Sequence, residues 1–320
     1  MQGIGAYVFT EPGDYEASLS EAKIELLVTG RGPFKANLTR TELGQLHLLR
    51  IRENLASIAY SALRPDLAFV TFPTRFDPRP VWGGQVLQPG DMIFHGLGEH
   101  VHERTTGPSE KSFIALKPDH LAYWSKVLTE EEVVPPNSAQ IFRPPQSAAS
   151  GLLYLHASAC DLVEKSPDVI AHPEVTRALE QELIHALITC LRPEAPLQTR
   201  PISARRTAVM SRLEDVLAAH ADRPLHVPEL CMEIGVSERT LRLYCGESLG
   251  MSPARYLRLR HLKLVRRALR KADPETTSVA AVARRYGFAE LGRFASVYRA
   301  VYGEAPSATL RLRGHQRPPD

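Results

Sequence analysis

One stretch in the last third of the chain constrains the fold more than any other feature. It reads VARRYGFAELGRFASVYRAVYGEAP over residues 282–306, with Gly287 near its start. Apolar residues recur at helical spacing before this glycine and again after it. The second set comprises Phe294, Val297, Tyr298 and Val301. Two short amphipathic helices that meet at a glycine form a helix-turn-helix.

The same pattern occurs earlier in the chain. Residues 230–236 match residues 282–288 at an offset of 52, including the turn glycine. Beyond the turn the offset is 53, because the second copy has one extra residue there. The matching pairs are Leu241 with Phe294, Cys245 with Tyr298, Leu249 with Tyr302, Gly250 with Gly303 and Pro253 with Pro306. This repeat predicts two helix-turn-helix units, at about residues 227–249 and 279–302.

The repeated segment resembles the DNA-binding domain of the AraC/XylS family of bacterial transcription regulators, over about residues 207–311. Residues 287–306 are close to the family signature of Gly-Phe, Phe, Phe/Tyr and Gly-x-x-Pro. The chain departs from the family at Leu243 and Cys245, where Arg and Phe are common, and Arg311 lies one place later than the usual Tyr-Arg. The resemblance implies two helix-turn-helix units joined by a long helix, here Pro253–Lys271.

Charge is distributed unevenly along the chain. Residues 200–320 contain 22 Lys and Arg against 12 Asp and Glu, whereas residues 1–199 contain 17 against 24. This asymmetry is typical of a protein in which one domain contacts nucleic-acid phosphates and the other does not. The helix Pro253–Lys271 carries eight of the basic residues, which either touch phosphates or form a solvated face.

The second helix of each unit is predicted to enter the major groove, where base edges show distinct donor and acceptor patterns. In the first unit Leu241 and Cys245 face the core. Arg239 and Arg242 therefore point outward, with guanidinium groups suited to guanine. Glu238 either accepts a hydrogen bond from a cytosine amino group or is a favourable acid in the first turn of its helix.

In the second unit the resemblance implies that Gly292, Arg293 and Ser296 occupy base-contacting positions. Because Gly292 has no side chain to read with, we expect weaker discrimination there. The full set of predicted DNA-binding residues is Glu238, Arg239, Thr240, Arg242, Leu243, Gly292, Arg293, Ser296 and Arg299.

The first part of the chain is predicted to be rich in strands. Between Ile24 and Ile114, short apolar segments alternate with Gly, Pro and Asp turns, which is typical of a small β-barrel or sandwich. The pattern resembles the cupin-like sensory domain of the same family. The predicted fold class is therefore α+β, with an N-terminal cupin-like β-barrel and a C-terminal all-α domain. The predicted domains are an effector-sensing barrel at 1–146, a helical dimerisation segment at 147–192, a linker at 193–203 and the DNA-binding domain at 204–320.

One pattern in the barrel points to an effector. Arg75-x-x-x-Arg79, followed by Asp91, resembles part of the PilZ-type motif, which binds cyclic dinucleotides through paired guanidinium groups. The usual Ser of that motif is replaced by Ile93, and two arginines in a Pro-rich loop are otherwise solvated. We predict that Arg75, Arg79, Asp91 and His95 bind a small-molecule effector, for which a cyclic dinucleotide is one option.

A second pattern allows an alternative class of function. Glu99, His100, His102 and Glu103 have a spacing at which imidazoles and carboxylates point into a barrel from one strand and bind a metal. A metal-dependent cupin enzyme with a DNA-binding tail is therefore the main alternative. The competing interpretation is an exposed polar strand edge, and His120 is badly placed to supply the further histidine that a metal cupin needs.

The helix predicted at Pro173–Leu191 has an apolar stripe. It comprises Leu179, Leu183, Ala186 and Cys190, widened by Leu187 and Leu191. Two heptads are compatible with a helix packed only on its own barrel. The resemblance favours a seam between the two chains of a homodimer.

The sequence thus predicts a DNA-binding transcription regulator, with an operator in double-stranded DNA and RNA polymerase as partners. We expect no enzymatic activity, no catalytic residues, no metal and no cofactor. An effector-independent DNA binder is a further alternative, and activation and repression are left open. Four cysteines without C-x-x-C spacing, no leader-like N-terminus and no apolar run of about 20 residues favour the cytoplasm and exclude a membrane partner.

Overall fold

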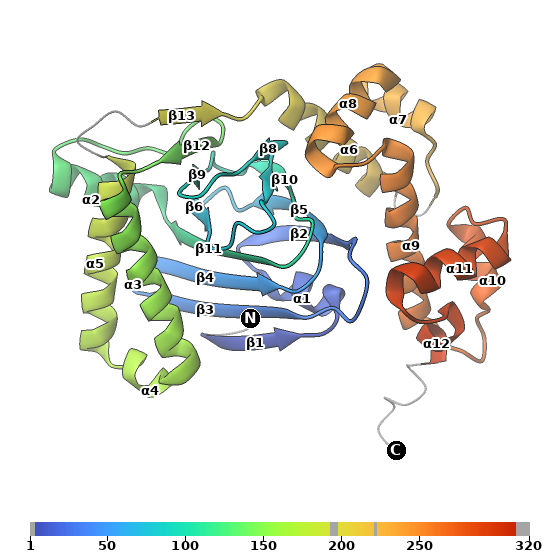
Figure 1. Ribbon diagram of the computed structural model, residues 1–320, viewed down its shortest axis with the longest axis horizontal. Helices are drawn as coiled ribbons and strands as arrows, with labels where there is room; N and C mark the ends of the chain where they lie inside the picture. Colours follow the sequence, from blue (N-terminus) through green and yellow to red (C-terminus); the bar gives the residue numbers. More distant parts are fainter. Residues whose placement is uncertain (1–3, 193–197, 221–222, 312–320) are drawn as a thin grey trace. The chain divides into compact units, whose positions relative to one another are not determined.

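The computed structural model describes residues 4–192, 198–220 and 223–311 (Figure 1). These residues form two compact units. The first contains the residues up to Leu26 together with Phe34–Ala204, and the second contains Leu27–Pro33 together with the residues from Arg205 onward. Strands dominate the first unit and helices the second, which confirms the predicted α+β class.

The strands of the first unit lie in two sheets rather than in one closed barrel. Trp82 and Val101 of the smaller sheet pack with Ile93 and Ile141 of the larger one, so the two sheets enclose a common core. The larger sheet has the order β1 (Gly5–Phe9), β3 (Ala36–Leu43), β4 (Leu46–Glu53), β11 (Ser109–Leu116), β6 (Ala68–Pro73), β9 (Met92–Phe94), β12 (Gln140–Arg143) and β13 (Gln198–Pro201). The smaller sheet has the order β2 (Ala22–Val28), β5 (Ser57–Leu63), β10 (His100–Arg104), β7 (Val81–Trp82) and β8 (Gln85–Val86).

Helices cover one side of the larger sheet. The helices of the first unit are α1 (Pro12–Ser18), α2 (Pro118–Thr129), α3 (Gln146–Lys165), α4 (Pro167–Ile170) and α5 (Pro173–Leu191). Helices α3 and α5 lie side by side, and α3 packs on β3 and β4 (Figure 1). Leu152 and Ala159 of α3 and Leu183 of α5 share one apolar core with Leu46 and Leu48 of the sheet.

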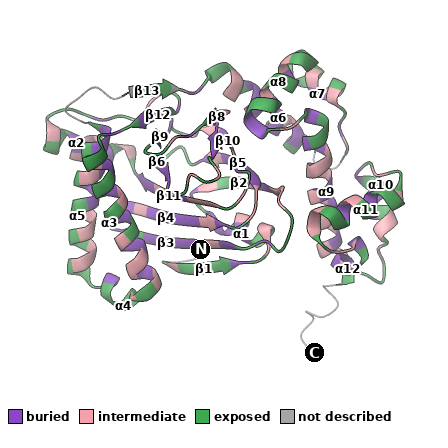
Figure 2. Ribbon diagram, in the orientation of Figure 1, coloured by how far each residue is buried: buried purple, intermediate pink, exposed green. Residues whose placement is uncertain are grey.

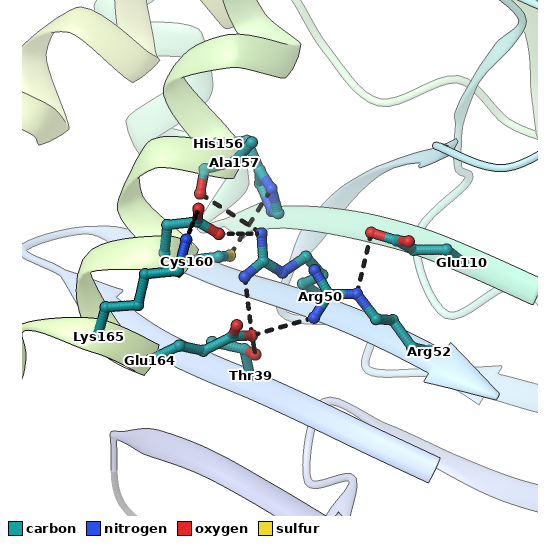
Figure 3. Close-up of polar contacts among 10 residues, drawn as sticks. Thr39, Arg50, Arg52, Glu110, His156, Ala157, Cys160, Glu164 and Lys165 are labelled. Carbon is teal, nitrogen blue, oxygen red and sulfur yellow. Dashed lines mark hydrogen bonds and ion pairs between the residues drawn. The ribbon is translucent and has the colours of Figure 1, made fainter. Parts of the chain in front are cut away.

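A polar network fixes α3 to the sheet (Figure 3). Arg50 of β4 lies 2.8 Å from Asp161 and 2.7 Å from Glu164, both on α3. Thr39 of β3 donates a hydrogen bond to Glu164, and Arg52 reaches the same carboxylate at 3.4 Å. Because Arg50 is almost fully buried, its two carboxylate partners compensate a charge that would otherwise be costly to desolvate.

Beside this network, His156 and Cys160 lie one helical turn apart on α3. Burial lowers the pKa of His156 to about 4 and raises the pKa of Cys160 to about 12. At neutral pH the imidazole is therefore uncharged and the thiol is protonated. Such a thiol is a poor nucleophile, and the pair contributes packing rather than chemistry.

The apolar stripe of α5 is buried within its own unit. Leu183 and Cys190 are 0% exposed and Leu187 is 1% exposed, because all three belong to the core that α5 shares with α3. The structure thus shows a helix packed on its own domain, the alternative to the dimer seam. The outer face of α5 is polar and exposed (Figure 2), with Glu174, Arg177, Gln181, Glu182 and His185 along it.

The predicted linker is described only in part. Residues 193–197 lie outside the described residues. The residues that follow, Gln198–Pro201, form β13, which pairs with β12 at the edge of the larger sheet. None of the helices in the described residues is both long enough and apolar enough to cross a membrane.

Seven helices of the described residues form most of the second unit. They are α6 (Ala204–Ala219), α7 (Val227–Ile234), α8 (Glu238–Leu249), α9 (Pro253–Lys271), α10 (Val279–Arg285), α11 (Leu291–Tyr302) and α12 (Pro306–Arg311). The side chains of Ser237, Ser252 and Ser278 cap α8, α9 and α10 by accepting backbone N–H groups of the first turn. Helix α9 connects the two helix-turn-helix units, α7 with α8 and α10 with α11 (Figure 1).

Candidate nucleic-acid interface

A glycine in the left-handed region forms the turn of each helix-turn-helix. The backbone φ is 74° at Gly235 and 85° at Gly287, values that residues with a Cβ adopt only with strain. A Cβ at Gly287 would also lie 2.9 Å from the Cβ of Pro224. At Gly235 such an atom meets no neighbour within 4 Å among the described residues. Both turns therefore need glycine, and the second needs it for two reasons.

Helix α8 separates a buried face from an exposed one. Leu241 and Cys245 are 0% exposed and fix the inward face. Ser237 accepts the backbone N–H of Thr240 at 3.2 Å, which fixes where the helix begins. The predicted reading residues Glu238, Arg239, Arg242 and Leu243 are exposed, and Thr240 is half-buried. The structure therefore brings the predicted residues of the first unit together on one outward surface.

Two residues of this surface form a pair that the sequence alone did not reveal. Arg242 donates a hydrogen bond to Glu238 at 2.5 Å, one helical turn away, and both side chains are more than half exposed. An exposed pair of this kind adds little stability, so its main effect is to orient the guanidinium. Arg239 makes no side-chain hydrogen bond or ion pair with any other described residue, and its donors are open to a partner.

Helix α11 repeats this arrangement. Phe294 and Tyr298 are 2% and 0% exposed and face the core, where each ring contacts the next along the helix. The predicted residues Gly292, Arg293, Ser296 and Arg299 are all exposed. Ser296 donates its hydroxyl to the carbonyl of Gly292 at 3.1 Å. Of the three base-contacting positions that the resemblance implies on this helix, Arg293 is the one with a guanidinium that could donate two hydrogen bonds to a base.

The basic residues of α9 divide into two kinds. Arg260 is paired with the buried carboxylate of Glu214, which also accepts the hydroxyl of Tyr256 at 2.7 Å. Arg266 lies 3.3 Å from Glu304 and 4.7 Å over the ring of Tyr302. These two arginines hold helices of the second unit together. The sequence predicts only phosphate contacts or a solvated face for the basic residues of this helix, so it does not reveal this role. Arg255 and Arg267 are exposed.

The four predicted effector residues have separate surroundings. Arg75 and Arg79 are exposed, and Arg75 donates to the carbonyl of Asp77 at 2.7 Å. Asp91 is 3% exposed and is held by Arg143 at 2.6 Å and by Arg200 of β13. The buried His95 contacts the hydroxyl of Thr71 and the carboxylate of Glu99, each at 2.9 Å. No hydrogen bond or ion pair within the described residues joins the four to one another.

The residues of the alternative metal site also have other partners. The Glu99 carboxylate meets His95, and Nδ1 of His100 lies 3.0 Å from the Tyr60 hydroxyl. Glu103 is paired with Lys111, and burial raises the pKa of Glu103 although the nearby charge of Lys111 opposes the rise. In the part of the chain that the structure describes, no cluster of three or more His, Cys, Asp or Glu side chains is placed to hold a metal.

A cavity that the sequence did not indicate lies in the first unit. Its volume is about 560 Å³. Phe94, Val133, Phe142 and Leu191 supply apolar walls, and Asn137 supplies a polar group. Its residues come from β9, β12, the end of α5 and the loop before β12. The cavity could not be predicted from a local sequence pattern, because its lining residues come from segments that lie far apart in the chain.

Comparisons with known proteins find helix-turn-helix regulators that match the region of the repeat. A family model described as a helix-turn-helix domain matches residues 230–312. The probable thc operon regulatory protein of Rhodococcus erythropolis is 32% identical over 147 residues, which are 46% of this chain and 44% of that protein. The XylDLEGF operon transcriptional activator 2 of Pseudomonas putida is 35% identical over 101 residues, which are 32% of this chain and 64% of that protein. The chain thus spans less than two thirds of either relative.

Among solved structures, the AraC-like transcriptional activator CuxR is similar to 81% of this chain, over 94% of its own length. The identity is 16% and the TM-score is 0.39.

The fold and the exposed helices of the second unit define a protein with a double helix-turn-helix domain. On the sequence matches to the curated regulators, the second unit is similar to the DNA-binding part of AraC-type regulators.

Proposed function

We propose that this chain is a sequence-specific DNA-binding transcription regulator rather than an enzyme. The observation that carries the proposal is the same division of faces in both copies of the repeat. Leu241 with Cys245, and Phe294 with Tyr298, are buried, whereas the predicted reading residues of α8 and α11 are exposed. A helix whose core face is fixed in this way presents a defined set of side chains to the major groove.

The two helices have unequal reading capacity. Helix α8 presents the guanidinium groups of Arg239 and Arg242. Among the base-contacting positions implied on α11, only Arg293 has a guanidinium that could donate two hydrogen bonds to one base. A bidentate arginine contributes about 1–3 kcal/mol of discrimination at one base pair. We therefore assign more sequence information to the first unit. Because the two helices would enter successive major grooves, the two blocks they read are centred about 10 base pairs apart.

A binding-site selection experiment on the full chain tests this proposal. We expect two blocks of preferred bases, and Arg242→Ala should weaken the selected site about tenfold or more while relaxing preference at one position. Arg267→Ala is the matched control, because Arg267 is an exposed arginine on α9 outside both reading helices. A single compact block, or the same loss of discrimination in both variants, would contradict the proposal.

The remaining partners belong to the same proposal. We place the protein in the cytoplasm as a homodimer that acts with RNA polymerase at an operator. Activation is supported by the name of the Pseudomonas putida relative, which is a transcriptional activator. Since the stripe of α5 is buried, a dimer must use another surface of the chain.

For the first unit we propose an effector-binding role. Arg75 and Arg79 are two exposed cations of this unit, suited to a phosphate-bearing effector such as a cyclic dinucleotide, and the buried Asp91 and His95 would contribute to the same site. Calorimetric titration of the full chain with a cyclic dinucleotide tests this, with Arg75→Ala as the variant. Arg64→Ala is the control, because Arg64 is an exposed arginine already paired with Asp66. Equal heats in the wild type and in Arg75→Ala would exclude Arg75 from the site.

A further inference from the structure

A hollow of about 460 Å³ lies inside the second unit, between its two helix-turn-helix units. Its walls come from the segment Pro224–Val227 before α7, from one face of α9, and from the turn between α10 and α11. Sites for small molecules usually have volumes of about 300–1,000 Å³. The hollow is therefore large enough for a small organic molecule.

The floor of the hollow is apolar. Leu225 and Leu257 are 3% and 5% exposed, and Phe294 is 2% exposed. The half-buried ring of Phe288 completes this lining and lies 5.0 Å from the ring of Phe294. An aromatic or aliphatic group that entered the hollow would remove this surface from water, which is the usual driving force for binding apolar ligands.

The rim of the hollow carries two arginines and a histidine. Arg258 and His261 project from neighbouring turns of α9, and Arg293 projects from the first turn of α11. Within the described residues, none of these three side chains makes a hydrogen bond or an ion pair. In contrast, Arg260 and Arg266 on the same helix α9 have the carboxylate partners described above.

The field at the rim is positive as well. The pKa of His261 is lowered first by burial and then by the nearby side chains of Arg260 and His226. Glu290 is the one acid among the residues that line the described hollow. Unpaired cations beside an apolar floor match a ligand that has an anionic group and an apolar body.

We propose that this hollow binds a small organic anion with an aromatic or aliphatic body. The anionic group would be bound by Arg258 and Arg293, with His261 beside them, and the apolar body would cover Leu257 and Phe294. A DNA backbone could use the same cations, but sugar and phosphate groups would leave the apolar floor unfilled. The regulatory consequence rests on the proposed function: Arg293 is also a predicted base reader, so ligand and DNA would compete for it.

Two fluorescent probes of similar shape test the site in the full chain. 1-Anilinonaphthalene-8-sulfonate has the required sulfonate and aromatic body, and N-phenyl-1-naphthylamine has the same rings without the charge. We expect Arg258→Gln to weaken sulfonate binding about tenfold, the usual effect of losing one charge-assisted hydrogen bond, and to leave binding of the neutral probe unchanged. Arg267→Gln, the control on the same helix, should change neither.

Two further variants locate the probe. Ala254→Trp and Ala289→Trp place a large side chain on two walls of the hollow, α9 and the turn between α10 and α11. Both positions are exposed, so we expect the variants to fold, and each should abolish sulfonate binding. Circular dichroism checks that both variants fold. Undiminished probe binding in both Trp variants would show that the site is elsewhere and overturn the proposal.

A measurement of DNA binding distinguishes the proposed DNA-binding function from the proposed ligand site. A DNA duplex carrying the selected site should displace the sulfonate probe. If Arg258→Gln weakens DNA binding but leaves sulfonate binding equal to that of Arg267→Gln, the cations serve the DNA backbone and the ligand site is refuted. If the wild type binds the probe but no DNA sequence, the proposed function fails and the ligand site stands.

Discussion

The two turn glycines offer a matched pair of substitutions. Gly235 and Gly287 have nearly the same φ, 74° and 85°, but different surroundings. An alanine at either position must adopt the left-handed conformation. At Gly287 the new Cβ would in addition lie 2.9 Å from Cβ and 3.2 Å from Cγ of Pro224. The difference between the two variants therefore isolates the cost of that contact.

The backbone strain of a residue with a Cβ in the left-handed region is about 1–2 kcal/mol. Overpacking in a closely packed site adds about 1–3 kcal/mol. We expect Gly235→Ala to lower the free energy of unfolding by about 1–2 kcal/mol, the backbone strain alone. Gly287→Ala should lower it by about 2–5 kcal/mol, because the contact with Pro224 is added. Gly246→Ala should instead raise it by about 0.5–1 kcal/mol, because Gly246 lies within α8 and its φ is not positive.

Native-state hydrogen exchange measures these effects locally, since amides of α8 and α11 report the opening of their own units. Gly287→Ala should reduce protection mainly in α10 and α11, and Gly235→Ala mainly in α7 and α8. Urea unfolding of the three variants gives the corresponding free energies. If Gly287→Ala cost no more than Gly235→Ala, the contact with Pro224 would have no energetic weight and the argument would fail.

Three other measurements follow from the structure. DNA binding should fall steeply between low and physiological salt, because each phosphate contact by Lys or Arg releases counterions and the second half of the chain is basic; a flat response would exclude such contacts. The first unit should lose stability as the pH falls from 6.5 to 4, since the pKa of His156 is 6.5 in the unfolded chain and about 4 in the folded one, so the unfolded state binds the proton first. This loss reaches about 3 kcal/mol at pH 4 and should be absent in His156→Gln, as urea unfolding at several pH values would show. Arg266→Ala should destabilise the second unit by about 1–2 kcal/mol through its contacts with Glu304 and Tyr302, whereas Arg267→Ala should leave its melting temperature unchanged.

The helices of the second unit could be predicted well because their signals are local. Both copies of the repeat place buried residues at helical spacing and a glycine at each turn. Proline in the first turn marks where α5 and α9 begin, and the observed bounds Pro173–Leu191 and Pro253–Lys271 are those predicted. The exposure of the predicted base-reading residues could be derived in the same way, because a fixed inward face determines the outward one.

The strands of the first unit were harder to predict because several contain buried charges. Arg40 lies within β3 at 3% exposure, compensated by Glu21 at 2.7 Å, and Glu103 of β10 is buried against Lys111 of β11. When the residue that pairs with it is unknown, a charged residue in a short segment leads to the prediction of a loop rather than a strand. Glu21 lies just before β2 and Lys111 lies on β11, so no local pattern contains these partners.

The candidate effector residues show the same difficulty. Asp91 has the sequence context of a ligand-binding acid, yet its partners Arg143 and Arg200 are 52 and 109 residues away in the chain. A carboxylate that three arginine nitrogens already contact is largely satisfied. Only the tertiary structure reveals that Asp91 ties β13 to the rest of the sheet.

Glu238 allows a final test of how α8 reads DNA. The sequence left two roles open, an acceptor for a cytosine amino group and a favourable acid in the first helical turn. The structure adds its hydrogen bond to Arg242 at 2.5 Å. If the orienting and helix-terminal roles are the whole of its function, Glu238→Gln should remove a negative charge that repels DNA phosphates and raise the affinity for all sequences severalfold.

The same variant should lose about 0.3–1 kcal/mol of helix stability, because a carboxylate near a helix N-terminus interacts favourably with its dipole. Glu247→Gln is the matched control, since Glu247 is a carboxylate near the other end of α8 and is paired with Arg206 at 2.8 Å. Site selection with both variants decides between the roles. Unchanged base preference with higher affinity in Glu238→Gln supports the orienting role, whereas lower affinity confined to sites with one particular cytosine would show that Glu238 reads that base directly.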